Sequence, residues 1–419
     1  MSLFDPIKEK ELEKFLAYNF GHEEFKGDLK RTRRFFSPYR SKFKKIITIG
    51  GTNGKGETSS HLANLIKGDG KKVALWTSPH IVSVRERFNY GGELIDNEDL
   101  LKEFKRSLRK IKFLFGKFSY YEFLFFVFIR LARKKKIEVL VLEVGLGGRL
   151  DAVNHFDAQI SVITSISRDH QAILGNTLEK ILFEKLGISR PKRPLITSLE
   201  LEYCRFLTKK YCQEMEILNI DLHNLGIIDE SMEYSHRNKL LAAFTFEYFK
   251  NQFVPKSLNI SKYSFQSLKG RFEELKFGPI TFIFVGSHNI DGVRKLMQKI
   301  SLGKQDFDAA LLSFSKRPDQ EIETILGIFL GSFKKVMVTS FEHIKAATQL
   351  KDQADKNKVE FVTDWKTYLE SKIKNQDKPE TILVSGSYYF VGEVQKFLFS
   401  FSDISAPGIR PSQDSANPG

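Results

Sequence analysis

The chain has 419 residues, of which 41% are hydrophobic and 28% are charged, the composition of an ordinary soluble globular protein. This length is long for one core and favours two α/β domains. The 66 basic and 51 acidic residues leave a formal net charge of +15, which would attract nucleic acid, anionic membranes or polyanionic small molecules. Because the basic residues are spread along the chain without an aromatic-basic pattern, we expect a triphosphate or poly-acid substrate and no nucleic-acid partner.

Neither a membrane span nor a secretion signal is predicted. The most apolar stretch, 120–132, contains Glu122 and Arg130 and falls short of the roughly 20 residues that a span needs, so we expect a buried helix. The N-terminus is rich in charge and lacks a signal-peptide pattern. Cys204 and Cys212 lie on one predicted helix at a spacing that suits neither a metal site nor a redox pair. We interpret them as packing residues of a cytoplasmic protein in a reducing compartment.

Strands and helices are predicted to alternate after a polar, basic helical segment over residues 1–44. The predicted strands of the first series are 46–49, 73–77, 137–144, 159–166 and 194–197. The predicted helices are 55–67, one capped by Asp96 and running to about Phe115, 120–132, 177–188 and 199–213, and a hairpin tip is expected at 90–93. This alternation predicts an α/β fold with a doubly wound, mainly parallel sheet.

A second alternating series begins near Ile280. Its predicted strands are 280–285, 308–313, 335–339, 359–362 and 381–385, with amphipathic helices between them. We expect an N-terminal ATP-binding domain over 1–268 and a smaller Rossmann-like α/β domain over 269–402, joined by a linker at 267–270. The tail 403–419 is rich in Ser, Pro and Gly and is expected to be disordered.

The stretch Ile46–Ser60, I-I-T-I-G-G-T-N-G-K-G-E-T-S-S, carries the clearest functional pattern. A β-branched run stops at two glycines, and Lys55 then opens a polar helix. Glycine lets the backbone curl with its N–H groups inward, and the helix N-terminus adds the positive end of its dipole. Together with the charge of Lys55, this pattern predicts a site for a nucleotide triphosphate. It departs from the strict phosphate-loop pattern because Gly56 and Glu57 follow the lysine.

Polar residues also follow other predicted strands, at the edge where parallel sheets bind ligands. Glu143 ends an apolar strand, where a carboxylate is costly unless it meets a cation, so it is a candidate magnesium ligand or a strand-end salt bridge. Asp169 and His170 come after the next strand, and this position favours a functional histidine. Lys185 lies among apolar residues of a helix, where a lone lysine would usually extend its charge to the surface.

Taken in order, these motifs resemble the folylpolyglutamate synthase/dihydrofolate synthase family of the Mur ligase superfamily. The matches in the first domain are G-T-N-G-K-G, T-S-P-H, L-E-V-G-L-G-G-R-L-D-A-x-N, T-S-I-x-x-D-H and E-K-x-G-I. The matches in the second domain are Gly270-Arg271-Phe272, Ser287-His288-Asn289 and Gly386-Ser387-Tyr388. The resemblance covers roughly residues 40 to 400. Each motif alone is weak, but the ordered set is specific.

The resemblance implies an ADP-forming ligase that adds L-glutamate to folates, extending tetrahydrofolate and also converting dihydropteroate to dihydrofolate. ATP would phosphorylate a carboxylate, and the amine of glutamate would attack the acyl phosphate. The implied cofactors are ATP and Mg²⁺, with a carbamate on Lys185. The implied partners are small molecules only (folate or dihydropteroate, L-glutamate and ATP), bound by a monomer that contacts no membrane.

The resemblance also implies roles for individual residues. The catalytic residues would be Lys55, Lys185, His170 and His288. The nucleotide would be bound by Gly51, Thr52, Asn53, Gly54, Lys55, Gly56, Glu57, Thr58, Arg271, His288 and Asn289. The metal ligands would be Glu143, His170 and Glu57. The substrate would be bound by Ser78, Pro79, His80, Ser119, Tyr121, Glu122, Asp151 and Ala152, of which Ser119, Tyr121, Asp151 and Ala152 resemble the pterin pocket of bifunctional members.

The chain departs from the family at several of these positions. Glu57 replaces a serine whose hydroxyl coordinates magnesium, although Thr58 could substitute for it. Val285 replaces an aspartate on the nucleotide side, and Val153 and Ser119 replace threonines. These changes leave three readings open: a divergent but active folate ligase, a Mur-type ligase for another carboxylate, or a regulatory nucleotide-binding homologue with weakened catalysis.

Overall fold

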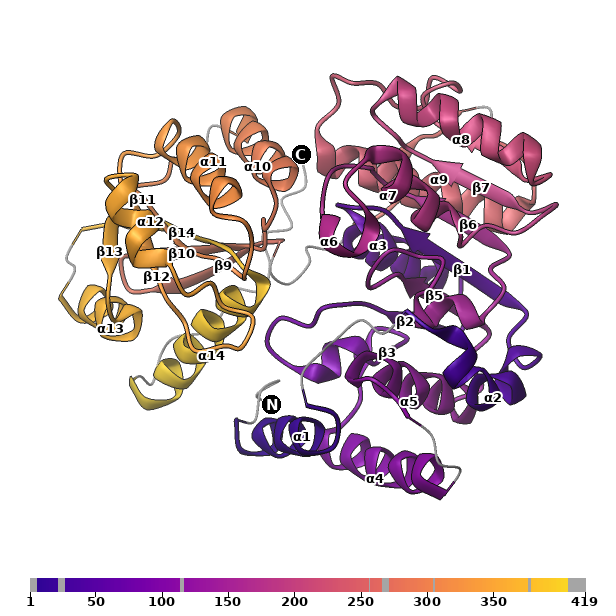
Figure 1. Cartoon of the computed structure of the whole chain (residues 1–419), viewed down its shortest axis with the longest axis horizontal. Helices are drawn as coiled ribbons and strands as arrows, with labels where there is room; N and C mark the ends of the chain where they lie inside the picture. The colour runs from indigo at the N-terminus through magenta and orange to yellow at the C-terminus, as the bar shows by residue number, and fades with distance from the viewer. Residues whose placement is uncertain are drawn as a thin grey trace. The chain divides into compact units, whose positions relative to one another are not determined.

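The computed structural model describes residues 6–21, 27–113, 117–255, 257–265, 271–303, 306–375 and 378–405. The chain divides into two compact units, Met1–Gln266 and Ser267–Gly419, whose elements are labelled in Figure 1. The predicted linker at 267–270 lies outside the described residues, as does the predicted tail from residue 406 onward. Helical structure continues to Ser405 at the end of α14, which includes the first residues of that predicted tail.

The first unit is built on an eight-stranded sheet with the order β4-β3-β2-β5-β1-β6-β7-β8. Its strands are β1 (Lys45–Gly50), β2 (Val73–Trp76), β3 (Asn89–Tyr90), β4 (Glu93–Leu94), β5 (Val139–Glu143), β6 (Ile160–Ile163), β7 (Pro194–Thr197) and β8 (Leu218–Asp221). The strands from β2 to β8 in this order pair in parallel, and β3 and β4 add an antiparallel hairpin at one edge. The predicted mainly parallel sheet is therefore confirmed.

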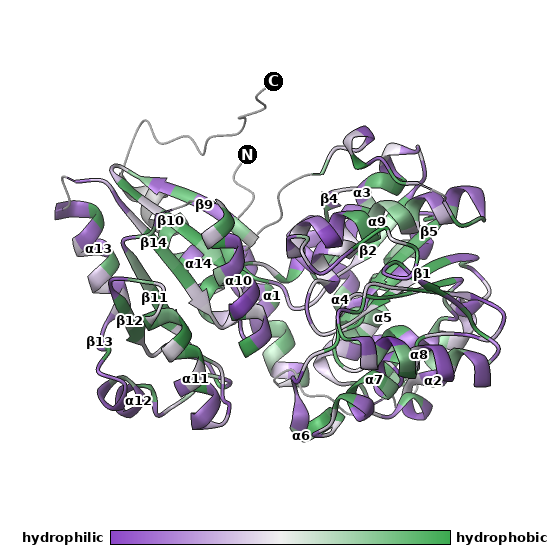
Figure 2. Ribbon diagram, turned by 90° about the horizontal axis from the view of Figure 1, so that it is seen from above, coloured by the Kyte–Doolittle hydropathy of each residue, from purple (hydrophilic) through white to green (hydrophobic). Residues whose placement is uncertain are grey.

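Helices cover both faces of this sheet because its parallel strands are apolar on both sides. In β5, Leu140 and Leu142 join one apolar cluster while Val139 and Val141 join the other, since successive side chains of a strand point to opposite faces. Figure 2 shows these strands in green inside the unit. The first cluster includes residues of α1 (Pro6–Phe20), α2 (Leu29–Arg40), α4 (Asn97–Phe113), α5 (Tyr120–Lys134), α6 (Gln171–Leu174), α7 (Leu178–Leu186) and α8 (Glu202–Glu214). The second includes residues of α3 (Lys55–Gly68) and α9 (Tyr234–Asn251). Short 3₁₀ turns lie at η1 (Val84–Arg87), η2 (Ala152–His155) and η3 (Ile260–Lys262).

Helix α5 contains the apolar stretch that the sequence predicts to be buried. No residue from Phe123 to Ile129 has any exposed surface. Its phenylalanines pack against α2, where the rings of Phe35 and Phe126 have their centroids 6.1 Å apart. Among the helices within the described ranges, none is long and apolar enough to cross a membrane.

The second unit is built on a six-stranded sheet with the order β13-β12-β11-β14-β10-β9. Its strands are β9 (Arg271–Phe277), β10 (Ile280–Val285), β11 (Ala309–Ser313), β12 (Val336–Thr339), β13 (Glu360–Val362) and β14 (Glu380–Gly386). Its helices are α10 (Ile290–Gly303), α11 (Asp319–Leu330), α12 (Leu350–Lys356), α13 (Trp365–Asn375) and α14 (Tyr388–Ser405). All its strand pairs are parallel except β9 with β10, which is antiparallel.

Candidate active site

The predicted phosphate loop is the turn from β1 into α3, and two of its glycines are required by its shape. Gly51 has φ +142° and Gly54 has φ +83°, a region that other residues rarely adopt. A Cβ on Gly51 would lie 2.0 Å from Thr164 Oγ1, and one on Gly54 would lie 2.5 Å from the hydroxyl of Tyr234. The loop therefore packs directly on its neighbours, with no room for side chains.

The end of β6 holds this loop in place. The N–H of Thr52 donates to Ser165 O at 2.8 Å, and the N–H of Asn53 donates to Ser165 Oγ at 3.0 Å. The hydroxyl of Thr164 donates to Asn53 O at 2.6 Å. Sequence reasoning quoted the T-S-I motif but did not assign Thr164 or Ser165 a role. Their role here corrects the expectation that every N–H of the loop faces the nucleotide, because two of these groups already bind β6.

The start of α3 remains the anion site of this turn. The first N–H groups of an α-helix have no partner within the helix and carry the positive end of its dipole. Gly54 occupies the N-cap position and has no side chain to cap them. The ammonium of Lys55 donates to Thr52 O at 3.0 Å, which holds its charge over the loop. Within the described residues the buried hydroxyl of Thr58 has no hydrogen-bond partner, so it remains available as the substitute ligand that the sequence suggests.

Glu57 lies in the first turn of α3, but its carboxylate faces α9. Oε2 accepts a hydrogen bond from Asn238 Nδ2 at 2.8 Å, and Oε1 accepts a short one from the hydroxyl of Ser235. The ring of His61, one turn along α3, lies 3.7 Å from Oε1. Because both carboxylate oxygens are bonded to α9, this geometry argues against the predicted role of Glu57 as a metal ligand.

Ser78 and Glu143 form a pair at the ends of the neighbouring strands β2 and β5. Glu143 is only 3% exposed, and its Oε2 accepts the N–H of Ser78 at 3.0 Å. The Ser78 hydroxyl is buried and has no hydrogen-bond partner among the described residues. A carboxylate beside an unused hydroxyl supplies the hard oxygen ligands that Mg²⁺ prefers. This Ser78–Glu143 pair therefore fits a magnesium ion, whereas the sequence assigned Ser78 to the substrate.

Lys185 is buried on α7, 4% exposed, and its ammonium donates to Gly51 O at 2.7 Å. Burial lowers the pKa of Lys185 from its ordinary 10.5 to about 7, and repulsion from Lys55 lowers it further. The charges of Asp169 and Asp151 act in the opposite direction. The structure thus places a partly neutral amine under the phosphate loop, and the alternative of a surface lysine is wrong.

His170 lies after β6, where α6 begins. It takes the left-handed conformation with φ +50°, and its N–H donates to Asp169 Oδ1 at 2.9 Å. Its side chain is half exposed, and Nε2 lies 3.9 Å from the same carboxylate oxygen. The imidazole therefore stands at the carboxyl edge of the sheet, where the sequence predicts it.

Two residues predicted to bind substrate instead begin helix α5. The hydroxyl of Ser119 accepts the N–H of Glu122, and Glu122 Oε2 accepts the N–H of Ser119 at 2.7 Å, which makes a capping box. Arg31 completes the arrangement with two hydrogen bonds to the Glu122 carboxylate, at 2.6 and 2.7 Å. These contacts account for both side chains without a ligand. Ala152 begins the η2 turn and is buried.

The connection after β2 continues from Ser78 through Pro79 to His80. Arg87 Nε lies 3.0 Å from His80 Nδ1, and because a guanidinium can only donate, this nitrogen accepts. A neutral His80 therefore carries its proton on Nε2. This tautomer presents an N–H donor on the side of the ring away from Arg87.

The predicted residues of the second unit cluster at the turn from β10 to α10. Asn289 Oδ1 accepts the N–H of Gly292 at 2.8 Å, which caps α10. The ring of His288 lies 5.2 Å from that of Tyr388, and Val285 belongs to the apolar core of this unit. Arg271 begins β9. The roles of Arg271, His288 and Asn289 toward the nucleotide stay predictions.

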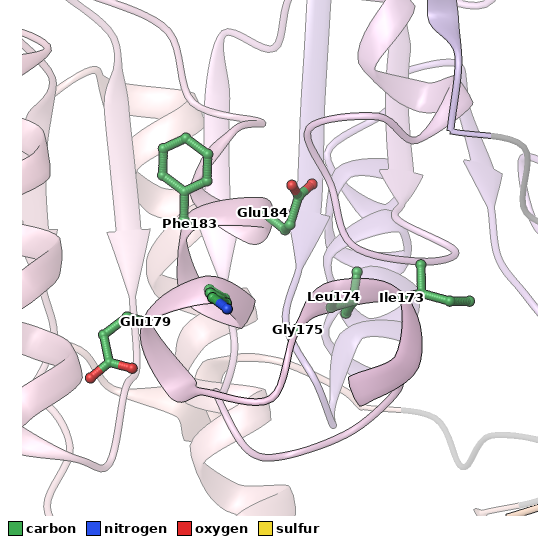
Figure 3. A pocket seen from close by; sticks show the side chains of 7 residues that line it. Ile173, Leu174, Gly175, Glu179, Phe183 and Glu184 are labelled. Carbon is green, nitrogen blue, oxygen red and sulfur yellow. The ribbon is translucent and has the colours of Figure 1, made fainter.

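A separate open cavity of about 480 Å³ lies between α6 and α7. Figure 3 shows Ile173 and Leu174 on α6 and Phe183 and Glu184 on α7 around it. Its lining residues are Ile173, Leu174, Gly175, Glu179, Lys180, Phe183 and Glu184. None of them was predicted to bind nucleotide, metal or substrate, so this cavity is distinct from the candidate site.

The fold and site define a nucleotide-binding α/β protein whose ligands bind at the carboxyl edge of a parallel sheet. No family model matches the chain. The chain is 28% identical to the dihydrofolate synthase/folylpolyglutamate synthase of Buchnera aphidicola, over 84% of this chain and 86% of the relative. It superposes on Escherichia coli FolC in complex with DHPP and ADP with a TM-score of 0.78, at 23% identity and over 93% and 98% of the two chains.

A bifunctional folylpolyglutamate synthase/dihydrofolate synthase with Mn, AMPPNP and L-glutamate bound matches with a TM-score of 0.77, at 24% identity and over 93% and 98% of the chains. Structural matches at this level of identity establish the fold. The full-length sequence relative carries the name that the motifs indicate. The resemblance to folylpolyglutamate synthase/dihydrofolate synthase and the fold class are therefore both confirmed.

Proposed function

We propose that this chain is an ATP-dependent ligase that adds L-glutamate to folates, with release of ADP and phosphate. One observation carries the proposal: the glycine loop, the Ser78–Glu143 pair and the buried Lys185 converge at one edge of the sheet. A phosphate loop alone would fit many nucleotide-binding proteins. A buried amine that hydrogen-bonds to Gly51 of that loop adds chemistry that binding alone does not need.

The residues of the first unit serve the transfer of a phosphoryl group. The start of α3 and the charge of Lys55 hold the phosphates of ATP and offset the charge that develops during transfer. The γ-phosphoryl group passes to a carboxylate of the folate, which gives an acyl phosphate and ADP. The amine of glutamate then attacks the acyl carbon, the carbon–oxygen bond to phosphate breaks, and an amide forms.

Magnesium would be held by Ser78 and Glu143, with a second ion held by His170 and a carbamate on Lys185. Bound there, the ions would neutralise phosphate charge and orient the transferring group. The carbamate forms when the neutral Lys185 amine attacks carbon dioxide and loses a proton. The lowered pKa of Lys185, about 7, supplies the neutral amine that this reaction needs.

Dihydrofolate synthase activity, a monomeric state and a cytoplasmic location belong to the same proposal. The cytoplasmic location is supported by the two free, buried thiols of Cys204 and Cys212. The reading of a catalytically weakened homologue rested on Glu57 and Val285. Its first argument weakens because the Glu57 carboxylate bonds to α9 and leaves the Ser78–Glu143 pair unaffected.

Phosphate release from ATP tests the proposal directly. The purified full chain is given ATP and Mg²⁺ with tetrahydrofolate plus glutamate, and separately with dihydropteroate plus glutamate. We expect stoichiometric phosphate and amide product with the first pair. ATP binding without phosphate release from either pair would refute the ligase function. Release with a different carboxylate alone would indicate a Mur-type ligase of another specificity.

A further inference from the structure

Asp151 lies behind the glycine-rich turn that follows β5, and its carboxylate accepts four hydrogen bonds. Oδ2 accepts the N–H groups of Gly145 and Leu146 at 2.9 and 3.0 Å. Oδ1 accepts the N–H of Val153 at 2.9 Å and the hydroxyl of Tyr121 at 3.1 Å. A carboxylate has about four lone-pair directions. Because Asp151 is also only 2% exposed, it has no acceptor position left for a substrate.

Tyr121 connects this carboxylate to the neighbouring strand. Its hydroxyl donates to Asp151 and accepts the indole N–H of Trp76 at 3.1 Å. Its ring packs on Gly145 so closely that a Cβ there would lie 2.8 Å from the ring. We call the chain of hydrogen bonds from Trp76 through Tyr121 to Asp151 the Tyr121 relay. A phenylalanine would keep the packing but remove both relay bonds.

The Tyr121 relay joins the two segments that carry the Ser78–Glu143 pair. Trp76 ends β2 two residues before Ser78, and Glu143 ends β5 two residues before Gly145. The parallel pairing of β2 with β5 reaches no further than Trp76 on β2. Beyond it, the printed links between the two segments are the bond from Ser78 N–H to Glu143 and the Tyr121 relay. The relay thus sets the spacing of both candidate metal ligands from behind.

We propose that Tyr121 and Asp151 are positioning residues for the Ser78–Glu143 pair and that Asp151 does not contact a pterin ring. The proposal rests on the proposed function, because it assigns a metal site to this pair. It replaces the substrate role that the resemblance implied for both residues. Recognition of a pterin then falls to groups other than the Asp151 carboxylate.

The test measures Mn²⁺ binding to the full chain with ADP present, by the electron paramagnetic resonance signal of free Mn²⁺. Tyr121→Phe is expected to weaken Mn²⁺ binding roughly threefold to tenfold, the size that loss of about one hydrogen bond produces. The KM for dihydropteroate and for tetrahydrofolate should stay within twofold of wild type. Tyr203→Phe is the matched control, since this exposed tyrosine bonds only to Glu179 on the surface in the printed contacts.

Asp151→Asn provides a second variant of nearly equal volume, and urea unfolding checks that both variants fold. Its amide group must place a donor against the N–H groups of Gly145 and Leu146 or of Val153, so its Mn²⁺ affinity should fall further. Unchanged Mn²⁺ affinity with a raised KM for the pterin substrates would overturn the proposal and restore a substrate contact. Mn²⁺ affinity that is unchanged in both variants would also overturn it. Wild-type protein without turnover would refute the ligase function, while the Mn²⁺ comparison would still decide the role of the relay.

Discussion

Replacement of Lys185 by methionine should abolish ligase turnover and yet stabilise the fold at neutral pH. The buried ammonium is held in a place that disfavours its charge, and burial lowers the pKa of Lys185 from 10.5 to about 7. Between these two values the unfolded chain keeps the lysine proton and the folded chain has lost it. The free energy of unfolding therefore rises with pH across this window, since the unfolded state binds more protons.

The size of the effect follows from the same pKa shift. A difference of 3.5 pKa units, 10.5 minus about 7, corresponds to a burial penalty of about 5 kcal/mol, present in full below pH 7 and absent above about pH 10.5. Lys185→Met removes this penalty but leaves Gly51 O without its donor, a loss of about 1–3 kcal/mol. We expect a net stabilisation of about 2–3 kcal/mol at pH 7.

Urea unfolding of wild type and Lys185→Met at several pH values from 7 to 10 measures this difference, in buffers free of bicarbonate so that no carbamate forms. The advantage of the variant should shrink steadily as pH rises and should be lost near pH 10. A free-energy difference that stays constant over this range would show that Lys185 titrates normally, which would refute the argument. Lys185→Arg is the control, because a guanidinium stays charged throughout.

Three further predictions concern the loop and the metal. Gly51→Ala places a Cβ 2.0 Å from Thr164 Oγ1 at φ +142°, so ATP binding measured by calorimetry should fall at least tenfold; unchanged affinity would show that the loop can shift freely. Ser78→Ala should weaken Mn²⁺ binding about tenfold or more while the urea midpoint stays constant, and normal Mn²⁺ affinity would exclude this hydroxyl as a ligand. Glu57→Ala leaves Asn238 without its acceptor and should cost about 1–3 kcal/mol of stability in urea, with Mn²⁺ affinity kept. A selective loss of Mn²⁺ affinity would instead make Glu57 a metal ligand.

The sheet and the phosphate loop could be predicted because their signals are local. Strand β1, its glycines and Lys55 are contiguous, so hydrophobic periodicity and glycine placement identify them together. Strand β9 was missed because it is an edge strand with charged residues. Helix α9 was missed because its buried residues surround the helix and give no single apolar stripe.

The direction of side chains could not be predicted, since it depends on elements far away in the sequence. Glu57 was expected beside the phosphates, but its partner Asn238 is 181 residues away. Asp151 was expected in a substrate pocket, but it binds the turn before it and Tyr121, 30 residues away. Single motifs define which residue types are present, and only the packing of α9 and α5 determines what they contact.

The bonds between the phosphate loop and the end of β6 have a consequence for binding kinetics. Thr52 and Asn53 are fixed by backbone and hydroxyl groups of the first unit itself, so the conformational entropy of the loop is lost when the unit folds rather than when a nucleotide arrives. A preorganised cradle of this kind needs no ordering step after encounter. Association of ATP with the first unit should therefore follow a single exponential whose rate rises linearly with ATP concentration.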